Sequence, residues 1–429
     1  MSTRSGNAGP SLPALEYNPF LPDVHADPYP LYHRLRREDP VHWNPPGVWL
    51  LTRYDDVAAV LRDPHLGRDP RNAAEVQALR ASLAPGQPLP WQDQAPSMLF
   101  ADPPDHTRLR TLVHKAFTPS AVEQLRPRVR ELVAELLDRV VGRGEMDVVD
   151  DLAYPLPVTV ICELLGIPPA DQARFRGWSA DLVHLLDPLV ATDALDRAMQ
   201  ARDALREYLA GVLAARRADP RHDLLTALLA AEEQGDRLSE AELLSMCVLL
   251  LVAGHETTVN LIANATLALL RHPRERARLA GDPTLAGRAV EELLRYDAPV
   301  QLTSRIALAD LELDGRRIGR GQSLVAVLGA ANRDPAQFPD PDQLDLTRGN
   351  AARHVAFGGG IHFCLGASLA RLEAQVALPA LFGRLPGLEL AGEPVWRDTI
   401  TLRGLARLPV RFPPVHAARC PARSAGVRG

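Results

Sequence analysis

Apolar residues recur every three to four positions through most of residues 104–297, a spacing that is typical of amphipathic helices. Helices with this spacing are predicted at 28–37, 54–62, 104–117, 120–142, 156–166, 170–187, 192–217, 222–233, 239–270, 286–297 and 365–384. Short strands are predicted at 41–52, at 303–325 and at about 388–412. Glycine and proline without a clear period predict irregular segments at 65–101 and 332–350. The pattern therefore predicts a mainly α protein with a few short strands.

Composition adds little beyond the class of protein. The chain has 429 residues, of which 46% are hydrophobic and 24% charged, and its formal net charge is −5. These proportions are those of a folded globular protein and exclude a disordered, collagen-like or coiled-coil chain. No linker-like tract or fixed-period repeat divides the sequence, so we expect one large domain that can enclose a sizeable cofactor. The mild acidity does not support nucleic-acid binding.

The most apolar stretch, Leu243–Leu270, is not expected to cross a membrane. Its longest uninterrupted run is Met246–Gly254, after which His255 and Glu256 intervene. A spanning helix needs about 18 or more apolar residues with few charges, so a buried core helix is predicted. The N-terminus has no apolar leader segment, and no CxxC pair occurs. A protein without a membrane anchor in the reducing cytoplasm is therefore expected.

The segment from Phe357 to Gly366 is the most informative one for chemistry. Three glycines, Gly358-Gly359-Gly360, precede Cys364, which stands at the start of a predicted helix. Consecutive glycines indicate positive φ or a close backbone approach, and a helix N-terminus favours a thiolate. A lone thiolate in such a loop suits an axial ligand to haem iron. A buried free cysteine is the alternative, and it is the better interpretation for Cys162 and Cys247.

Two further segments carry polar residues where apolar ones are expected. Ala253-Gly254-His255-Glu256-Thr257-Thr258 lies in the middle of the long apolar helix, where an acid and two threonines are costly unless they are hydrogen-bonded or functional. A threonine there can bond back to the carbonyl four residues earlier, so a kinked core helix is the alternative interpretation. Glu292 and Arg295 are spaced i and i+3 on one helix face, which taken alone is a common surface pair.

These segments resemble the cytochrome P-450 family over about residues 15–412, leaving 1–14 and 413–429 as tails that are expected to be flexible. Phe357 to Gly366 resembles the family's haem loop F-G-x-G-x-H-x-C-x-G, and Ala253 to Thr258 its oxygen-activation motif A-G-x-[D/E]-T-T. The resemblance implies a single mainly α domain with a long central helix over the haem and small peripheral β-sheets. It also implies haem b as cofactor.

The same resemblance implies a role for each matching residue. Cys364 would be the axial thiolate ligand of the haem iron, and Glu256 and Thr257 the catalytic pair that delivers protons and orients dioxygen. The haem propionates would be bound by His106 and Arg110, spaced i and i+4, and by Arg305 and His362. Glu292 and Arg295 would be structural, in a buried network with Arg348. Other residues expected to touch the haem are Leu99, Ala253, Gly254, Thr257, Leu302, Phe357, Gly358 and Gly366.

The implied activity is a bacterial monooxygenase that inserts one atom of O2 into a hydrophobic small molecule, such as a secondary metabolite, terpene, steroid or fatty acid. The positions expected to line the substrate pocket are mostly apolar: Trp91, Met98, Leu99, Leu182, Leu185, Leu250, Ala253, Val300, Leu302, Thr303 and Ile400. No flavin or iron–sulfur segment follows Cys364, so electrons are expected from a separate ferredoxin and ferredoxin reductase. Arg108, Lys115, Arg353 and Arg371 are the residues expected to dock the ferredoxin, and a monomer is expected.

Two alternatives to this activity remain at this point. A peroxide-driven peroxygenase would use the same haem, although members of the family that work this way typically lack the acid–threonine pair, which is intact here as Glu256-Thr257. A haem-binding sensor or carrier would have no need of a proton-delivery motif.

Overall fold

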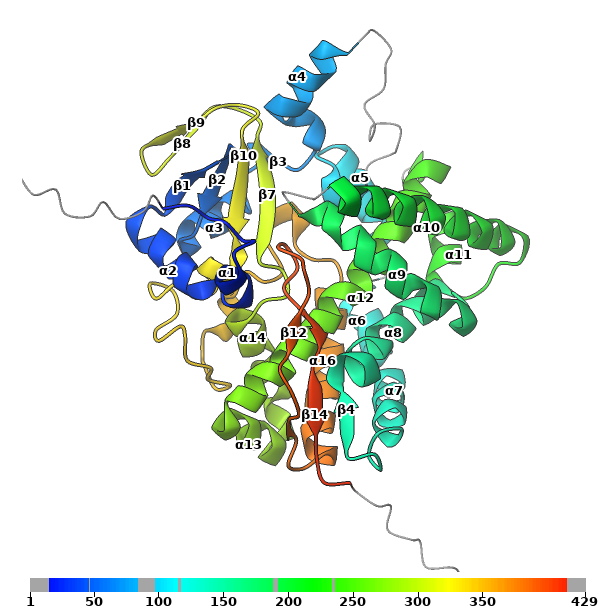
Figure 1. The fold of residues 1–429 in the computed structure, drawn as a ribbon. Coiled ribbons are helices and arrows are strands. Elements are labelled where there is room, and N and C mark those ends of the chain that lie inside the picture. Colours follow the sequence, from blue (N-terminus) through cyan, green and yellow to red (C-terminus); the bar gives the residue numbers. More distant parts are fainter. Residues whose placement is uncertain are drawn as a thin grey trace, which may run out of the picture.

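The computed structural model describes residues 15–45, 47–83, 97–114, 117–187, 192–233 and 236–414 (Figure 1). The helices are α1 Pro22–Ala26, α2 Tyr29–Glu38, α3 Tyr54–Val60, α4 Ala74–Ser82, α5 Asp105–His114, α6 Pro119–Glu123, α7 Arg126–Asp138, α8 Pro155–Leu165, α9 Gln172–Leu182, α10 Thr192–Ala218, α11 Leu224–Leu229, α12 Glu240–Arg271, α13 Pro273–Gly281, α14 Ala286–Tyr296, α15 Leu328–Ala331 and α16 Ala367–Arg384. The predicted mainly α class is confirmed.

The long helix α12 organises the core. Ser239 and Glu242 form a reciprocal capping box that satisfies backbone N–H groups at its start. From there α12 runs through the middle of the molecule and packs against α8, α10, α14 and α16 (Figure 1). Of its most apolar 18-residue stretch, 67% is buried inside the protein. By length and composition α12 could span a membrane, and within the described residues it is the only helix that could; its burial instead fits the predicted core helix.

The strands form small sheets beside the helical body (Figure 1). The largest has the order β1-β2-β10-β7-β3 and combines Val41–Asn44, Val48–Leu51, Ser323–Val327, Leu302–Ala307 and Leu66–Gly67. β10 pairs parallel to β2 and antiparallel to β7, with Leu324 opposite Arg305. This register fixes β7, which carries several of the predicted site residues.

The other strands form one three-stranded sheet and several two-stranded ones. A three-stranded sheet has the order β11-β14-β4, and the remaining strands pair as β12-β13, β5-β6 and β8-β9. Their bounds are β4 Glu145–Asp147, β5 Glu232–Glu233, β6 Asp236–Arg237, β8 Leu311–Leu313, β9 Arg316–Ile318, β11 Glu389–Leu390, β12 Val395–Trp396, β13 Leu405–Arg407 and β14 Pro409–Arg411.

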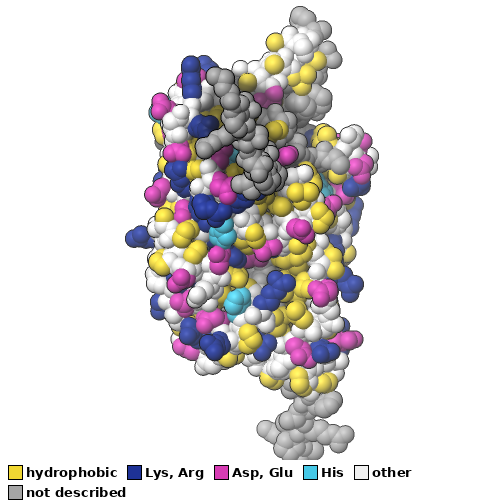
Figure 2. All heavy atoms as spheres, turned by 60° about the vertical axis from the view of Figure 1, so that its left-hand side comes forward, with side chains coloured by type: hydrophobic (Ala, Val, Ile, Leu, Met, Phe, Trp, Pro, Cys, Tyr) yellow, Lys and Arg dark blue, Asp and Glu magenta, His cyan; other side chains and the backbone are white. Residues whose placement is uncertain are grey.

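The prediction of an irregular segment over 65–101 was wrong in part. The structure places β3, a short 3-10 turn at Pro70–Asn72, helix α4 and a 3-10 turn at Met98–Phe100 within that range, while residues 84–96 lie outside the described part of the chain. Helix α4 has no buried residue and projects from the body (Figures 1 and 2). A helix that buries no face has no apolar stripe, so periodicity could not reveal it.

Proline explains two of the other differences between the predicted and observed elements. The predicted helix 120–142 is two helices, α6 and α7, because Pro127 lacks an N–H and fits only the first turn of a new helix. Pro273 likewise opens α13, which was not predicted. The range 170–187 ends as a 3-10 turn at Val183–Leu186. The range 222–233 is shortened to α11, and strand β4 with the π-helical turn Val149–Ala153 was not predicted.

On the face shown in Figure 2, basic and acidic side chains are interspersed rather than gathered into one patch.

Candidate functional site: a haem-thiolate pocket

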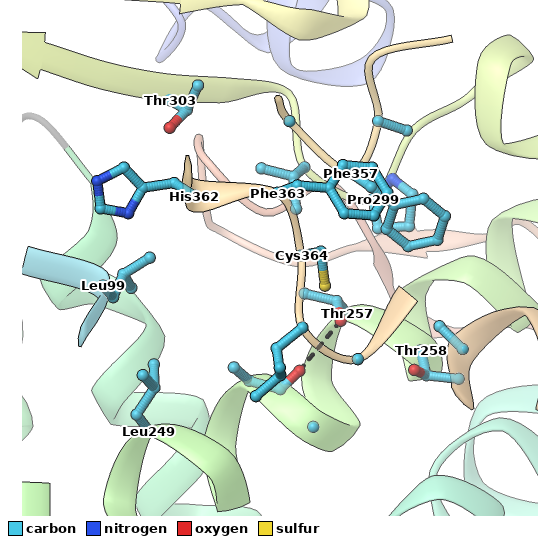
Figure 3. Close-up of a pocket in the computed structure, with 18 of the residues that line it drawn as sticks. Leu99, Leu249, Thr257, Thr258, Pro299, Thr303, Phe357, His362, Phe363 and Cys364 are labelled. Carbon is cyan, nitrogen blue, oxygen red and sulfur yellow. Dashed lines mark hydrogen bonds between the residues drawn. The ribbon is translucent and has the colours of Figure 1, made fainter. Parts of the chain in front are cut away.

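The loop before α16 brings Cys364 to the wall of an internal cavity. Gly358 and Gly360 adopt φ of 70° and 64°, and a Cβ at Gly360 would overlap the carbonyl oxygen of Leu61. The loop turns back on itself because the Cys364 N–H donates to the Phe357 carbonyl at 3.0 Å. The Cys364 side chain is exposed to the cavity, and its sulfur points into the space that Thr257 faces from α12 (Figure 3). The predicted need for glycine is therefore confirmed.

The charge state of Cys364 differs from the expectation for a helix N-terminus. Burial raises the pKa of the thiol, although a hydrogen bond from the Gly366 backbone and the charges of Arg110 and Arg371 act to lower it. The protein alone therefore favours the neutral thiol. A coordinated metal ion deprotonates a thiol outright, so the thiolate expected here needs iron as its partner.

One edge of the cavity is lined by basic side chains from four separate elements, and His106 packs against one of them. Arg68 follows β3, Arg110 lies on α5 with His106, Arg305 lies on β7, and His362 lies in the loop before Cys364. The rings of His106 and His362 are 4.3 Å apart between centroids. Arg110 Nη2 donates to the Phe363 carbonyl at 2.6 Å and so ties α5 to the loop. The fold thus brings together groups that come from distant parts of the chain.

In the described part of the chain these basic groups form no ion pair with a carboxylate, and the charge of Asp102 only partly offsets the effect of burial on the pKa values of Arg68 and Arg305. Both ring nitrogens of buried His106 and the Nε of Arg68 have no hydrogen-bond partner. Burial, together with the charge of Arg305, lowers the pKa of Arg68 to about 9, and burial lowers that of Arg305 to about 10. Burial and the neighbouring cations lower the pKa of His362 to about 2. Unpaired buried donors are costly, and the two propionates of haem b are the carboxylates that would satisfy them.

Helix α12 supplies the opposite wall. Thr257 Oγ1 donates to the Ala253 carbonyl at 3.1 Å, which is the predicted bond to the residue four positions earlier (Figure 3). Ala253, Gly254 and Thr257 all line the cavity. A Cβ on Gly254 would lie 3.0 Å from the Ile161 side chain, so glycine allows α8 to pack closely against α12 here.

Glu256 is held in a buried ionic network. Its carboxylate accepts hydrogen bonds from Arg397, which follows β12, and lies 3.3 Å from His255 Nε2. Although burial acts to raise the pKa of Glu256, His255 and Arg397 lower it to about 2. The carboxylate is therefore ionised and positioned at neutral pH, which resolves the cost of an acid inside an apolar helix.

The structure places the predicted pocket residues as follows. Met98, Leu99, Leu250, Ala253, Val300 and Thr303 line the cavity beside Cys364, and Leu182 and Leu185 line an adjoining pocket that shares Leu99, Leu249, Ala253 and Thr257 with it. Leu302 and Ile400 do not line either space, so these two predictions were wrong. They pack in an apolar cluster with Tyr32 and Val327. Trp91 lies outside the described residues.

The error at Leu302 has a simple cause. Successive side chains of a strand point to opposite faces, so Thr303 and Arg305, which line the cavity, share one face of β7 and Leu302 lies on the other. For the hairpin near the C-terminus, Leu402 rather than Ile400 reaches the adjoining pocket. The other predicted haem contacts, Phe357, Gly358, His362 and Gly366, all line the cavity, as do Arg110 and Arg305.

The predicted structural network is confirmed. Arg295 donates to both carboxylate oxygens of Glu292, at 2.7 and 2.8 Å, and both side chains are fully buried. Arg348 Nε donates to Glu292 at 3.1 Å. Arg295 also binds the carbonyls of Asn332 and Pro341, so the pair anchors the irregular segment that leads to the Cys364 loop.

Two site residues were not found from the sequence. Arg68 belongs to a segment that seemed irregular, and Arg397 is a single arginine near a short strand. Neither belongs to a motif or an apolar period, so no local signal marked them. Only the tertiary structure brings Arg68 to the basic edge and Arg397 to Glu256.

Among the described residues, the cavity is faced by one cysteine in a glycine loop, by an edge of cations without ion-pair partners, and by a long helix with an acid–threonine pair. This combination defines a haem-thiolate protein. Comparison with known proteins agrees: the cytochrome P450 family model matches residues 80–282 and 284–392. The chain belongs to the cytochrome P450 family. It is accordingly a haem-thiolate monooxygenase with haem b as cofactor.

Relatives match over nearly the whole chain. The sequence is 47% identical over 388 residues to cytochrome P450 107B1 of Saccharopolyspora erythraea, covering 89% of this chain and 94% of that protein. It is 46% identical over 396 residues to vitamin D(3) 25-hydroxylase of Pseudonocardia autotrophica, covering 90% and 94%. The crystal structure of the myxobacterial CYP267B1 in complex with myristic acid matches with a TM-score of 0.84 and 46% identity, covering 93% of this chain and 99% of that one.

Proposed function

We propose that this chain hydroxylates or epoxidises a hydrophobic small molecule at the cavity between α12 and the Cys364 loop, with electrons from a separate ferredoxin and ferredoxin reductase. The observation that carries the proposal is the convergence of Cys364, the basic edge and Thr257 on one cavity. Residues 15–412 form the catalytic unit of this proposal, which works as a monomer in the cytoplasm.

Each residue has a defined task in this proposal. Cys364 ligates the iron, and Arg68, His106, Arg110, Arg305 and His362 bind the propionates. When bound, haem supplies the dioxygen chemistry that inserts one oxygen atom into a C–H bond. The protein's part is to position the substrate, exclude water and deliver protons.

Proton delivery falls to Glu256 and Thr257. The Thr257 hydroxyl donates its hydrogen bond to the Ala253 carbonyl. The lone pairs of Thr257 Oγ1 can therefore accept a hydrogen bond from water in the cavity. Glu256, ionised and held by Arg397, accepts hydrogen bonds from water and so orders the water through which protons reach the cavity. Because these two groups are intact and positioned, the geometry favours dioxygen-dependent turnover over peroxide-driven turnover.

The substrate class follows from the lining. Leu99, Leu249, Leu250, Val300 and Ala253 give the cavity apolar walls. Away from the basic edge and Cys364, its polar lining residues are the threonines Thr257, Thr258 and Thr303. One relative is named for hydroxylation of vitamin D3 and another was solved with myristic acid, which supports a steroid-like or aliphatic substrate.

Fewer cations are available to dock a ferredoxin than the sequence suggested. Arg108 pairs with Glu242, and Arg371 pairs with Glu291 at 2.6 Å, so both charges are already engaged within the protein. Arg353 is exposed, and Lys115 lies outside the described residues. We propose Arg353 as the cation on the Cys364 side that recognises an acidic ferredoxin.

A carbon-monoxide difference spectrum tests the haem-thiolate assignment. The reduced wild-type protein should show the strongly red-shifted Soret band of a thiolate-ligated haem, and Cys364→Ala should lose it together with turnover. Retained hydroxylation in Cys364→Ala would contradict the ligand assignment. Consumption of reduced nicotinamide with a surrogate ferredoxin system, matched to product formed, then separates a monooxygenase from a haem carrier.

A further inference from the structure

A polar site lies at the outer end of the pocket that adjoins the haem cavity. This outer pocket is lined by Arg202 and Arg206 of α10 and, along α12, by Ser245, Val252 and Thr257. It includes none of the residues of the Cys364 loop. Between Ser245 and Glu256 the α12 residues that line the pocket are apolar, namely Val248, Leu249, Val252 and Ala253. The pocket therefore has one end at the arginines and the other at Glu256 and Thr257.

Arg206 is the group at this end whose charge has no acidic partner. Its Nη1 donates to the neutral Ser245 Oγ at 3.2 Å. The guanidinium makes no ion pair with a carboxylate in the described part of the chain, and Asp203, one turn away, pairs with Arg202 at 2.9 Å. Burial, followed by the charge of Arg202, lowers the pKa of Arg206. Arginine nevertheless stays protonated in proteins, so a half-buried cation faces the pocket.

The other charged residues of the outer pocket are already compensated. Arg71 and Asp69 pair with each other through several hydrogen bonds. Glu256, at the Thr257 end, is neutralised by Arg397 and His255. An anion in this pocket would therefore be attracted to the Arg206 end and would find no comparable site near Thr257.

The length of the pocket sets the length of the ligand. Ser245 and Thr257 are twelve residues apart on one helix, which corresponds to about 18 Å at 1.5 Å per residue. Since carbon–carbon bonds of about 1.5 Å zigzag in an extended chain, each bond advances it by about 1.25 Å, and about fourteen to fifteen carbons are needed to span that distance. A shorter acid bound at Arg206 could not present a carbon at the haem cavity.

We propose that Arg206 binds the carboxylate of a long-chain aliphatic acid, so that its far end lies beside Thr257 and is the part oxidised. This inference deepens the proposed function and rests on it, because it names the substrate class for the same cavity. Arg206 donates the charge-assisted hydrogen bonds, and the anion takes the place of the Ser245 Oγ that accepts from its Nη1 in this structure.

Spectral titration of the holoenzyme tests the proposal, using tetradecanoic acid and its methyl ester as probes. Both probes carry the same alkyl chain, which suits the apolar lining of the pocket, but only the acid carries a negative charge. The wild-type protein should bind the acid at least about tenfold more tightly than the ester, as expected for hydrogen bonds to a charged group. Equal affinity for the two probes in the wild-type protein would overturn the proposal without any variant.

Substitutions locate the effect. Arg206→Gln should weaken binding of the acid about tenfold and change that of the ester less than twofold, while Arg206→Lys, which keeps the charge, should recover part of the loss. Arg217→Gln is the matched control, because Arg217 lies on the same helix and pairs with Glu240 outside the pocket. Equal weakening of acid and ester in Arg206→Gln, or the same loss in Arg217→Gln, would show that Arg206 only tethers α10 to α12.

The position at which tetradecanoic acid is oxidised tests the orientation in which it binds. Oxidation of tetradecanoic acid should occur near its methyl end in the wild-type enzyme and spread along the chain in Arg206→Gln. Oxidation next to the carboxylate would refute the proposed orientation. A normal carbon-monoxide spectrum and normal ester binding in the same preparations show that the haem pocket is intact, so failure of this inference is distinguishable from failure of the proposed function.

Discussion

The ion pair between Glu256 and Arg397 is the contact whose removal should be most informative. Arg397 comes from the C-terminal hairpin and binds a carboxylate that is 1% exposed in the middle of α12. The pKa of Glu256 falls from its ordinary 4.5 to about 2, although burial alone would raise it. A depressed acid pKa stabilises the folded state above pH 4.5, and that stabilisation is lost as the pH falls toward 2.

The magnitude follows from the shift. A lowering of about 2.5 pKa units corresponds to about 3 kcal/mol at neutral pH, and His255 and Arg397 share the interactions that produce it. We therefore expect a coupling of about 2 kcal/mol between Arg397 and Glu256, the range in which buried charged hydrogen bonds fall.

A double-mutant cycle measures that coupling. The free energy of unfolding in urea is determined at pH 7 for the wild type, Arg397→Gln, Glu256→Gln and the double variant. Arg407→Gln serves as the control, because Arg407 belongs to the same hairpin but is 67% exposed and lies 3.4 Å from Asp147. Arg397→Gln should lose about 2 kcal/mol or more, and the loss should largely vanish when Glu256 is already Gln.

The pH dependence provides a second readout. Repeating the cycle at pH 3 should reduce the coupling free energy between Arg397 and Glu256. At that pH Glu256 is largely protonated in the unfolded protein, and it is partly protonated in folded Arg397→Gln, so less of the ion-pair energy contributes to stability. A coupling below about 0.5 kcal/mol at pH 7, or one that grows as the pH falls, would refute the conclusion that Arg397 holds Glu256 ionised.

Four further outcomes are expected. Thr257→Ala should keep its haem and its substrate-induced spectral shift but release more hydrogen peroxide per nicotinamide oxidised; tight coupling in that variant would contradict a role in oxygen activation. Glu292→Gln should lower stability by roughly 3–5 kcal/mol and reduce haem content, because Arg295 is left buried without a charged partner; haem retention and chemical unfolding check this. Arg68→Gln should increase haem loss to apomyoglobin about tenfold by removing one propionate donor, and unchanged transfer would exclude that contact. Arg353→Glu should slow turnover with ferredoxin and leave peroxide-supported turnover unchanged; equal slowing of both would refute docking at Arg353.

Much of the site could be predicted because its residues lie in short motifs. Cys364, His362 and the glycines occupy ten consecutive positions, and Glu256 with Thr257 another short window. The backbone conformation within such windows can be predicted locally, because glycine is the residue that most readily adopts the positive φ found at Gly360. The close contact of Gly360 with Leu61 is a further, non-local reason for glycine at this position. The helices with a buried face were found for the same reason, since burial imposes a 3.6-residue period.

The errors occurred where no local signal exists. Helix α4 buries no side chain, Leu302 and Ile400 differ from their cavity-lining neighbours only in the direction they point, and Arg68 belongs to no motif. The direction of a side chain within a strand depends on which strand it pairs with, and here β7 is set by its pairing with β10.

The sequence alone therefore predicted the class of fold, the candidate axial cysteine and the acid–threonine pair, because each depends on residues close together in the chain. The burial of Glu292 and Arg295 followed only from the family resemblance and is shown by the structure. Only the tertiary structure decided which distant cations surround the haem edge, which arginine holds Glu256, and that Arg206 leaves a positive charge at the outer end of the substrate pocket. Those features arise from contacts between elements up to hundreds of residues apart. Such contacts are selected by packing of the whole core and by the cost of leaving a buried charge alone, and neither is written in any local stretch of sequence.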